Sequence, residues 1–372
     1  MTEIPLNMGK GLHAFFYRGL WRSLVSITLV SGGLSACSQV APPDSATMHP
    51  ATPSMALPAA PLRVPSPSPR TRTPTGLAPG GLAALPAGEY LLVIRSEERL
   101  DPQREEWLSL FALSLDGALG PVIASDIGSD AALSRDGALL AFLAEVPADS
   151  GGRHLVVVDL WTGDRVQALA GFGRAHVPSW SPDSSRLALS MGGDLYVVAL
   201  NDGSLEKALS CTGIPGGGCG GPQWSPDGEY LAYVFDLSRS GPPDPSEGVY
   251  VLNTRCIAGG PGCEAETIGP ISTANGPWEW APDGRLLAVG SYDGSVELYS
   301  SGTWALERTL ATSQGLDVNS LAWSPDGEWM ALALGPDMHI SRISLASGEE
   351  IPVYEGGNVR RLVAWISVGS AP

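Results

Sequence analysis

Short apolar runs, separated by polar segments, recur along the chain from about residue 89 to residue 367. The runs at residues 155–158, 195–198, 249–252 and 296–299 are rich in valine, leucine and tyrosine, which favour β-strands. Segments rich in Gly or Asp separate them, as expected for short strands joined by tight turns. The pattern therefore predicts an all-β domain built from many short strands.

A five-residue motif divides this pattern into repeats. Trp-Ser-Pro-Asp-Gly is complete at residues 224–228 and 323–327, and looser copies lie at residues 133–137, 180–184 and 280–284. An apolar run follows every copy. The aspartates of the five copies are Asp136, Asp183, Asp227, Asp283 and Asp326. They are 47, 44, 56 and 43 residues apart, which is the length of one four-stranded propeller blade.

Two partial copies of the repeat bracket the complete ones. Residues 86–91 align with residues 226–231, and residues 363–366 align with residues 321–324. Six full periods then lie between the two ends. We predict a six-bladed β-propeller over residues 86–368, in which the C-terminal strand at about 361–367 joins the sheet begun by residues 89–95. Such closure leaves no open sheet edge in the ring.

Each part of the motif has a structural role in this interpretation. The tryptophan ends the inner strand of a blade and fills the gap to the neighbouring blade. Ser-Pro-Asp-Gly matches a type I turn, with Pro at its second position and Gly at its fourth. We expect the repeated aspartates to accept backbone hydrogen bonds in their turns and not to form a catalytic ring.

These repeats resemble the TolB-type propeller family, whose repeats carry Trp-Ser-Pro-Asp-Gly before an apolar strand. Residues 289–299 read equally well as a WD repeat, and the choice between the two subfamilies stays open. The paired Gly-His and Trp-Asp of strong WD repeats are absent from the sequence, which favours the TolB-like side. The resemblance implies a β-propeller that serves as an interaction module, although a fold by itself is a weak warrant for function.

The N-terminal segment reads as an export signal. Lys10, Arg18 and Arg22 precede a short apolar stretch that ends in Leu-Ser-Ala-Cys at Cys37. This end resembles the lipobox of bacterial lipoproteins, which implies cleavage after residue 36 and lipidation of Cys37; an ordinary secretory signal is the alternative. Translation starts at Met1 or at Met8. In lipoproteins of bacteria with two membranes, an Asp directly after the lipidated cysteine usually retains the protein in the inner membrane. This chain has Ser38 there, so the resemblance favours the outer membrane or the cell surface.

Composition separates the segments that follow. Residues 37–85 are rich in Pro, Ala, Ser and Thr, so they are assigned to a linker that cannot form a core. This linker is interpreted either as a stalk or as a disordered tether. Residues 369–372 form a short tail. The predicted location is extracytoplasmic, with a membrane anchor through the lipid on Cys37.

Charge and motifs exclude several functions. The chain has 22 Lys and Arg against 39 Asp and Glu, a formal charge of −17, which argues against nucleic acid as a partner. It lacks the Gly-x-Ser-x-Gly, His-Glu-x-x-His and phosphate-loop motifs. We therefore assign no catalytic residue, no metal and no cofactor, and we expect a monomer.

Four of the five cysteines lie in two close pairs. Cys211 and Cys219 fall between two blades, whereas Cys256 and Cys263 fall between the third and fourth strands of one blade. These positions lie on opposite faces of a propeller, too far apart for a cross-link between the pairs. We predict the disulfides Cys211–Cys219 and Cys256–Cys263, as is usual in exported proteins. A metal site is the alternative, but the spacing is wide for zinc.

One face of the predicted propeller carries the loops between blades, and we name it the loop face. Its polar residues include Asp317, Asn358 and Arg361, and the four that we predict at the channel mouth are Arg174, His176, Asn319 and Arg360. The favoured function is an interaction module for an envelope protein or peptide. The alternative is an enzyme, or a glycan- or small-ligand-binding protein, that uses the central channel.

Overall fold

A computed structural model gives the fold of residues 81–97, 107–145, 153–172, 175–212, 217–236, 245–257, 267–274 and 276–369. The predicted signal segment, Cys37, most of the predicted linker and Cys263 lie outside these described residues. No helix in the described part of the chain is long and apolar enough to cross a membrane.

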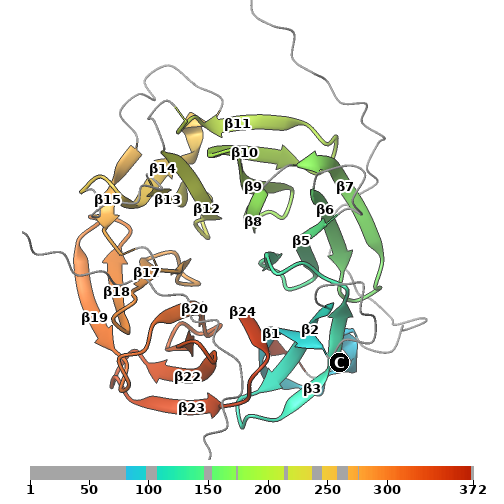
Figure 1. The fold of residues 1–372 in the computed structure, drawn as a ribbon, viewed down its shortest axis with the longest axis vertical. Helices are drawn as coiled ribbons and strands as arrows, with labels where there is room; N and C mark the ends of the chain where they lie inside the picture. The colour runs from blue at the N-terminus through green and yellow to red at the C-terminus, as the bar shows by residue number, and fades with distance from the viewer. Residues whose placement is uncertain are drawn as a thin grey trace, which may run out of the picture. The chain divides into compact units, whose positions relative to one another are not determined.

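The described residues form a ring of six four-stranded antiparallel sheets around a central axis (Figure 1). This confirms the predicted six-bladed propeller. Blade 1 contains β24 (Val359–Val368), β1 (Gly88–Glu97), β2 (Trp107–Ser114) and β3 (Leu119–Ser125). Blade 2 contains β4 (Ala131–Leu133), β5 (Leu139–Glu145), β6 (Arg153–Asp159) and β7 (Arg165–Phe172). Blade 3 contains β8 (Ala175–Trp180), β9 (Arg186–Met191), β10 (Asp194–Ala199) and β11 (Leu205–Leu209).

The remaining three blades follow in chain order. Blade 4 contains β12 (Gly218–Trp224), β13 (Tyr230–Asp236), β14 (Gly248–Asn253) and β15 (Thr267–Ser272), with the short 3-10 helix η2 (Thr254–Cys256) after β14. Blade 5 contains β16 (Trp278–Trp280), β17 (Leu286–Gly290), β18 (Ser295–Ser300) and β19 (Leu306–Ala311). Blade 6 contains β20 (Val318–Trp323), β21 (Trp329–Leu334), β22 (His339–Ser344) and β23 (Glu350–Tyr354).

The two ends of the propeller sequence meet in blade 1. β24 pairs antiparallel with β1, from Gly88 opposite Val368 to Arg95 opposite Val359. This is the predicted closure, and it joins the last segment of the chain to the first strand by hydrogen bonds. The ring therefore closes within one sheet, to which both ends of the propeller sequence contribute strands.

The packed domain also includes residues that the sequence analysis assigns to the linker. η1 (Leu82–Ala84) is a 3-10 turn, and both Leu82 and Leu85 are buried in the core between blades 1 and 2. The backbone N–H of Leu82 donates to the carbonyl of Leu160 over 3.4 Å. The two leucines gain from burial, so this stretch packs with the propeller.

The repeated turns are built by side-chain hydrogen bonds. In four of them the serine hydroxyl donates to the aspartate two residues later, over 2.5 to 2.6 Å. The aspartate in turn accepts a backbone N–H, for example that of Glu229 onto Asp227 over 3.0 Å. Asp283 accepts in the same way although Ala281 replaces the serine. The aspartates therefore serve the turns, as predicted.

Three of the motif tryptophans link their blade to the one before it. The indole N–H groups of Trp180, Trp280 and Trp323 donate to the carbonyls of Ala132, Gln223 and Glu279, over 3.0 to 3.3 Å. Each acceptor is the penultimate residue of the inner strand in the preceding blade. The rings themselves are buried between blades.

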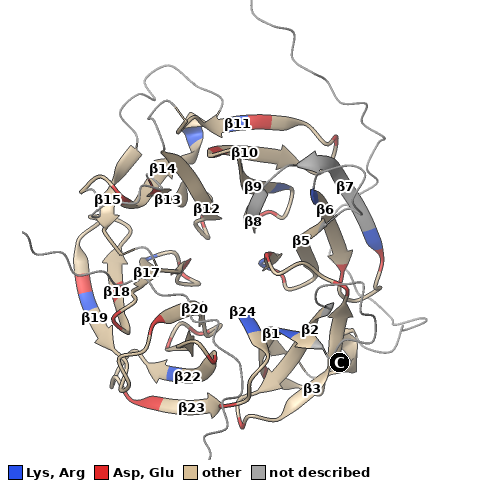
Figure 2. Cartoon of the chain, in the orientation of Figure 1, with Lys and Arg blue, Asp and Glu red and all other residues tan. Residues whose placement is uncertain are grey.

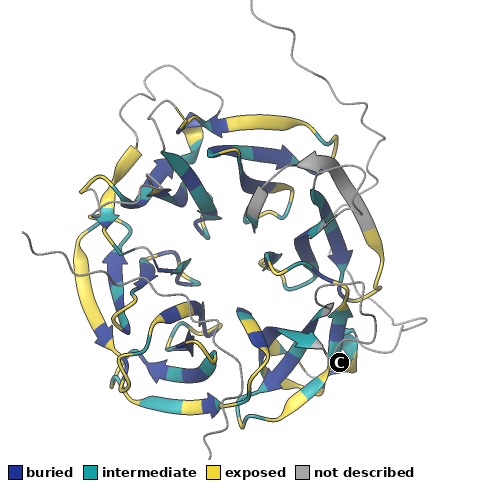
Figure 3. Ribbon diagram, in the orientation of Figure 1, coloured by how far each residue is buried: buried dark blue, intermediate teal, exposed yellow. Residues whose placement is uncertain are grey.

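Burial follows the layers of each blade (Figure 3). The second and third strands are largely buried, whereas the outer strands β11 and β19 are mostly exposed. The hydrophobic core is consequently divided into six clusters. The inner strands face both these clusters and the central axis, and this second face positions the candidate site.

Candidate functional site

The six inner strands surround a central channel of about 1110 Å³. Its lining comes from β4, β8, β12, β16, β20 and β24 and from the turns that follow them. Every blade therefore contributes one strand to the same cavity. Each inner strand runs from the loop face to the side of the repeated turns. The channel therefore has a loop-side end, called the mouth, and a turn-side end.

The turn-side end of the channel is bridged by Arg135. Four repeats place a proline there, at Pro182, Pro226, Pro282 and Pro325, but blade 2 has Arg135 at this position. Its guanidinium donates to the carbonyl of Pro226 and, over 3.0 Å, to that of Pro282. These acceptors belong to blades 4 and 5, so the arginine ties one side of the ring to the other.

The loop-side mouth holds two of the four predicted residues. Asn319 on β20 and Arg360 on β24 are exposed and line the channel. Asn319 donates to the carbonyl of Gly335 over 2.7 Å, which fixes its amide. His176 lies on β8, four residues before Trp180. Asn319 has the same position relative to Trp323 on β20. Arg174 lies outside the described residues.

The structure adds residues to this mouth that the sequence analysis did not select. Tyr292, in the turn between β17 and β18, lines the mouth and is 59% exposed. Asp130, just before β4, accepts from Arg153 over 3.3 Å and lies 3.8 Å from an Arg361 guanidinium nitrogen. Figure 2 shows basic residues on β24, at the inner side of the closing blade. Asp130 thus ties blades 1 and 2 together beside the channel.

Deeper in the channel, the position before the blade tryptophan carries two polar side chains. Gln223 on β12 and Glu279 on β16 occupy it in the adjacent blades 4 and 5, and both line the channel. Burial raises the pKa of Glu279 to about 8, because the positive charge of Arg361 offsets the loss of solvation only in part. Burial likewise lowers the pKa of Arg361, against the opposing effects of Asp130 and Glu279.

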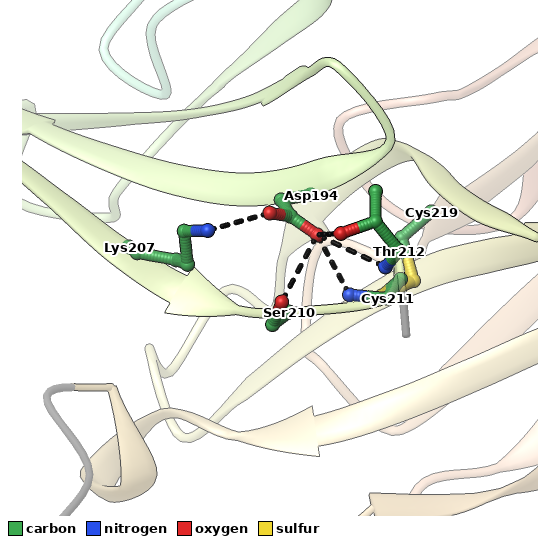
Figure 4. Close-up of polar contacts among 6 residues, drawn as sticks. All are labelled: Asp194, Lys207, Ser210, Cys211, Thr212 and Cys219. Carbon is green, nitrogen blue, oxygen red and sulfur yellow. Dashed lines mark hydrogen bonds and ion pairs between the residues drawn. A yellow bond between two sulfur atoms is a disulfide. The ribbon is translucent and has the colours of Figure 1, made fainter. Parts of the chain in front are cut away.

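A second polar cluster supports the loop face without lining the channel (Figure 4). Asp194, at the start of β10, is only 6% exposed. Its carboxylate accepts from Lys207 over 2.6 Å and from the backbone N–H of Cys211 over 2.8 Å. Ser210 and Thr212 add further donors. Burial opposes ionisation of Asp194, but these donors together lower its pKa to about 2.

Cys211 and Cys219 form a disulfide beside this cluster, which confirms the first predicted pair. Cys256 is disulfide-bonded as well, and its predicted partner, Cys263, lies outside the described residues. In the described part of the chain, no group of three or more His, Cys, Asp or Glu residues is placed to hold a metal. A disulfide indicates an oxidising compartment.

We expect the Cys211→Ser, Cys219→Ser double variant to lose about 2 to 3 kcal/mol of unfolding free energy, from the closure of a short loop. The sequence separation of the two cysteines is 8. Denaturant titration without reductant measures the loss. Intact mass after alkylation without reductant provides the control, because a bonded pair takes up no label. An unchanged unfolding midpoint would contradict the expected contribution.

Comparison with known proteins places this architecture. The family described as "WD domain, G-beta repeat" matches residues 269–300 and 304–341, which lie in blades 4 to 6. The structure of TolB from Acinetobacter baumannii superposes with a TM-score of 0.55 at 20% identity, covering 75% of this chain and 66% of TolB. The described domain is a β-propeller that contains WD-type repeats and is similar in fold to TolB.

Other similar proteins share the propeller in different settings. A chain of the nidogen/laminin complex matches this propeller with a TM-score of 0.54 at 10% identity, covering 76% of this chain and 100% of that one. The uncharacterized peptidase YuxL of Bacillus subtilis is 27% identical over 190 residues, which are 50% of this chain but 25% of YuxL. A ciliary WD repeat-containing protein, ctxp80 of Euplotoides octocarinatus, is 37% identical over 67 residues, 17% of this chain and 9% of that protein.

This chain therefore spans a quarter or less of the curated relatives' length. At these identities the comparisons establish the propeller fold, and they do not transfer any relative's partner or activity to this chain.

Proposed function

We propose that this protein is a lipid-anchored, extracytoplasmic interaction module whose propeller binds an envelope protein or peptide at the loop-side mouth of its channel. The observation that carries the proposal is the mouth itself. It opens into a cavity of about 1110 Å³ and presents Tyr292, Asn319 and Arg360 together. Tyrosine and arginine are the residue types that most often dominate binding energy at interfaces.

Two further features support the location. The lipobox-like end at Cys37 is a motif of lipoproteins, and the disulfide between Cys211 and Cys219 suits export. An anchor of two or three acyl chains holds a protein stably at a membrane. The acidic composition suits a soluble surface that avoids nucleic acid.

We expect a chemical cross-linking pull-down from the native envelope to recover a stoichiometric protein partner. The secreted Cys37→Ala form is the control for recovery that depends only on the membrane anchor. Tyr292→Ser should reduce the capture at least about fivefold, because loss of a central aromatic contact at an interface costs 1 kcal/mol or more.

Leu306→Ser is the matched control for Tyr292→Ser. Leu306 is 50% exposed on the outer strand β19, remote from the channel lining. Its replacement should leave capture unchanged. Recovery of lipoprotein-sorting proteins alone, or an equal loss with both variants, would contradict a binding mouth at the channel.

A further inference from the structure

Three side chains that line the channel, those of Gln223, Glu279 and Arg361, carry polar atoms without a hydrogen-bond partner among the described residues. The Glu279 carboxyl group forms no hydrogen bond or ion pair with any described residue. Gln223 Oε1 and Arg361 Nε are buried and also lack a hydrogen-bond partner. An unsatisfied buried polar atom costs about 1 to 3 kcal/mol. The Glu279 carboxyl group lies beside these two atoms in the channel lining, so one cavity gathers a carboxyl group, an amide and a guanidinium that a polar ligand can approach.

The channel has room for such a ligand at this depth. Gln223 and Glu279 occupy the position before the blade tryptophan in blades 4 and 5. The other four blades have small residues there: Ala132, Ser179, Ala322 and Ala364. Indole N–H donation to the carbonyls of Gln223 and Glu279 fixes the backbone under both polar side chains. The polar side of the layer is therefore rigid and faces open space.

The charge of the loop-side half of the channel favours an anion. Its lining contains Arg360 and Arg361 against Asp130 and Glu279. Asp130 is already shared between Arg153 and Arg361. With its pKa at about 8, Glu279 is mostly uncharged at neutral pH and offers an O–H donor. With Glu279 uncharged, these four residues comprise two arginines and one ionised carboxylate, Asp130, in a chain that carries −17 overall.

The opposite end of the channel restricts the shape of the ligand. Arg135 bridges it by bonding the carbonyls of Pro226 and Pro282 across the ring. An extended chain that enters from the loop face cannot pass straight through this bridge. A chain end fits such a one-ended channel, and capture of a terminal carboxylate is a recurring mode of peptide recognition.

We propose that the channel binds the C-terminal carboxylate of a peptide, with Arg361 as its cationic partner and the Glu279 carboxyl group as a second donor. The inference rests on the proposed function and names the chemistry of its ligand. Arginine suits this role because its planar guanidinium pairs with carboxylates through parallel hydrogen bonds. Gln223, from the next blade, can complete the amide hydrogen bonds of the last residue.

The proposal sets the direction of the pH dependence. A peptide carboxylate is ionised above about pH 4, and the arginines stay charged across the neutral range. The charged groups that face Glu279 are Arg361 and, behind it, Asp130. Ionised Glu279 would repel the ligand. Affinity should therefore be constant from about pH 6 to 7 and fall as the pH rises through about 8, by up to tenfold per unit.

The test uses the full-length protein in detergent and a pool of randomised eight-residue peptides. One pool has free C-termini, and a second pool of the same sequences is C-terminally amidated. We expect enrichment of the free pool by at least about tenfold, the change that corresponds to 1.4 kcal/mol. Individual enriched peptides then give the Kd of each variant by fluorescence anisotropy.

Three variants assign the residues. Arg361→Gln should weaken the enriched peptides at least about tenfold. Glu279→Gln, which mimics the protonated acid, should keep the affinity at pH 6.5 and abolish its fall above pH 8. Arg308→Gln, on the exposed outer strand β19, is the matched control and should bind as the parent does. A thermal melt of each variant checks that it folds.

Several results would overturn the inference. A terminal carboxylate is excluded if the two pools are captured equally or if neither is captured. It is also excluded if amidated peptides are selected through acidic side chains. Affinity that rises with pH would indicate a cationic ligand at Glu279 instead. If Arg361→Gln still recovers the envelope partner at the parent level, the proposed interaction module stands and the carboxylate site is excluded. The Tyr292→Ser variant tests the interaction module separately.

Discussion

Trp323→Ala should lower the free energy of unfolding by about 3 to 5 kcal/mol, the range for deleting a large buried aromatic side chain. Trp323 is 5% exposed and belongs to the cluster between blades 5 and 6. Its indole N–H also donates to the carbonyl of Glu279 over 3.2 Å. The variant leaves both a cavity and an unpaired carbonyl, so the two losses act together. Denaturant unfolding followed by tryptophan fluorescence or circular dichroism measures the change.

Two companion variants separate these losses. Trp323→Phe keeps most of the ring volume but removes the donor, so we expect a smaller cost of about 1 to 2 kcal/mol. Trp161→Ala tests a tryptophan that is 42% exposed, and its stability should change little. A loss for Trp161→Ala as large as that for Trp323→Ala would show that the inter-blade position is not what matters.

Asp194→Asn should lower the free energy of unfolding by about 1.5 to 3 kcal/mol at pH 7, because it removes a buried carboxylate that accepts several hydrogen bonds, one of them from the partly exposed Lys207. The asparagine keeps one acceptor for Cys211 and Thr212, but its amide turns a donor toward Lys207. The cluster lies where blade 3 leads into blade 4 and holds the backbone next to the disulfide (Figure 4). Urea titration of both proteins measures the difference.

The ion pair between Asp194 and Lys207 also predicts how the free energy of unfolding changes at acid pH. The pKa of Asp194 is lowered in the folded protein to about 2, against about 3.9 in an unfolded chain. Its stabilisation is therefore complete above pH 4 and is lost as the pH falls through 4 toward 2. The difference between parent and Asp194→Asn should shrink by about 2 kcal/mol over that range. Asp202→Asn, at an exposed turn, serves as the control and should change stability little.

The contrast between Asp194 and Glu279 helps to separate support from binding. Asp194 is buried with several donors that hold its charge. Glu279 lines the channel, and its only printed interaction is the electrostatic one with Arg361. A satisfied carboxylate stabilises a fold, whereas an unsatisfied one at a cavity is typical of a functional site. This difference, more than the fold, directs attention to the channel.

Several features follow from the sequence because they depend on local chemistry. The spacing of Asp136, Asp183, Asp227, Asp283 and Asp326 defines the blade period, and Ser-Pro-Asp-Gly dictates the turn that each one stabilises. The partial repeats at the two ends predict the pairing of β24 with β1. The Cys211–Cys219 pair is close in sequence, so its disulfide needs no knowledge of distant contacts.

The channel could be predicted only in part. Asn319 and Arg360 were predicted at the mouth because they lie near the start of an inner strand, and both line the channel. Glu279 was missed, although a comparison of the repeats could have found it. At the position before the tryptophan, only Gln223 and Glu279 are large and polar, and the other blades have small residues. Asp130 was missed because the repeat of blade 2 is degenerate. Leu82 and Leu85 were missed because composition alone cannot reveal a contact with blade 2.

The sequence by itself therefore determined the repeat, the number of blades, the closure of the ring and the disulfide in the blade 3 to blade 4 connection. Only the tertiary structure decided which side chains share the channel, that Arg135 bridges its turn-side end, and that Glu279 and Arg361 face the same space. The reason is physical. Hydrogen bonds and turns act over a few residues, whereas ring closure brings strands from all six blades to one axis, where charge and burial depend on distances across the ring.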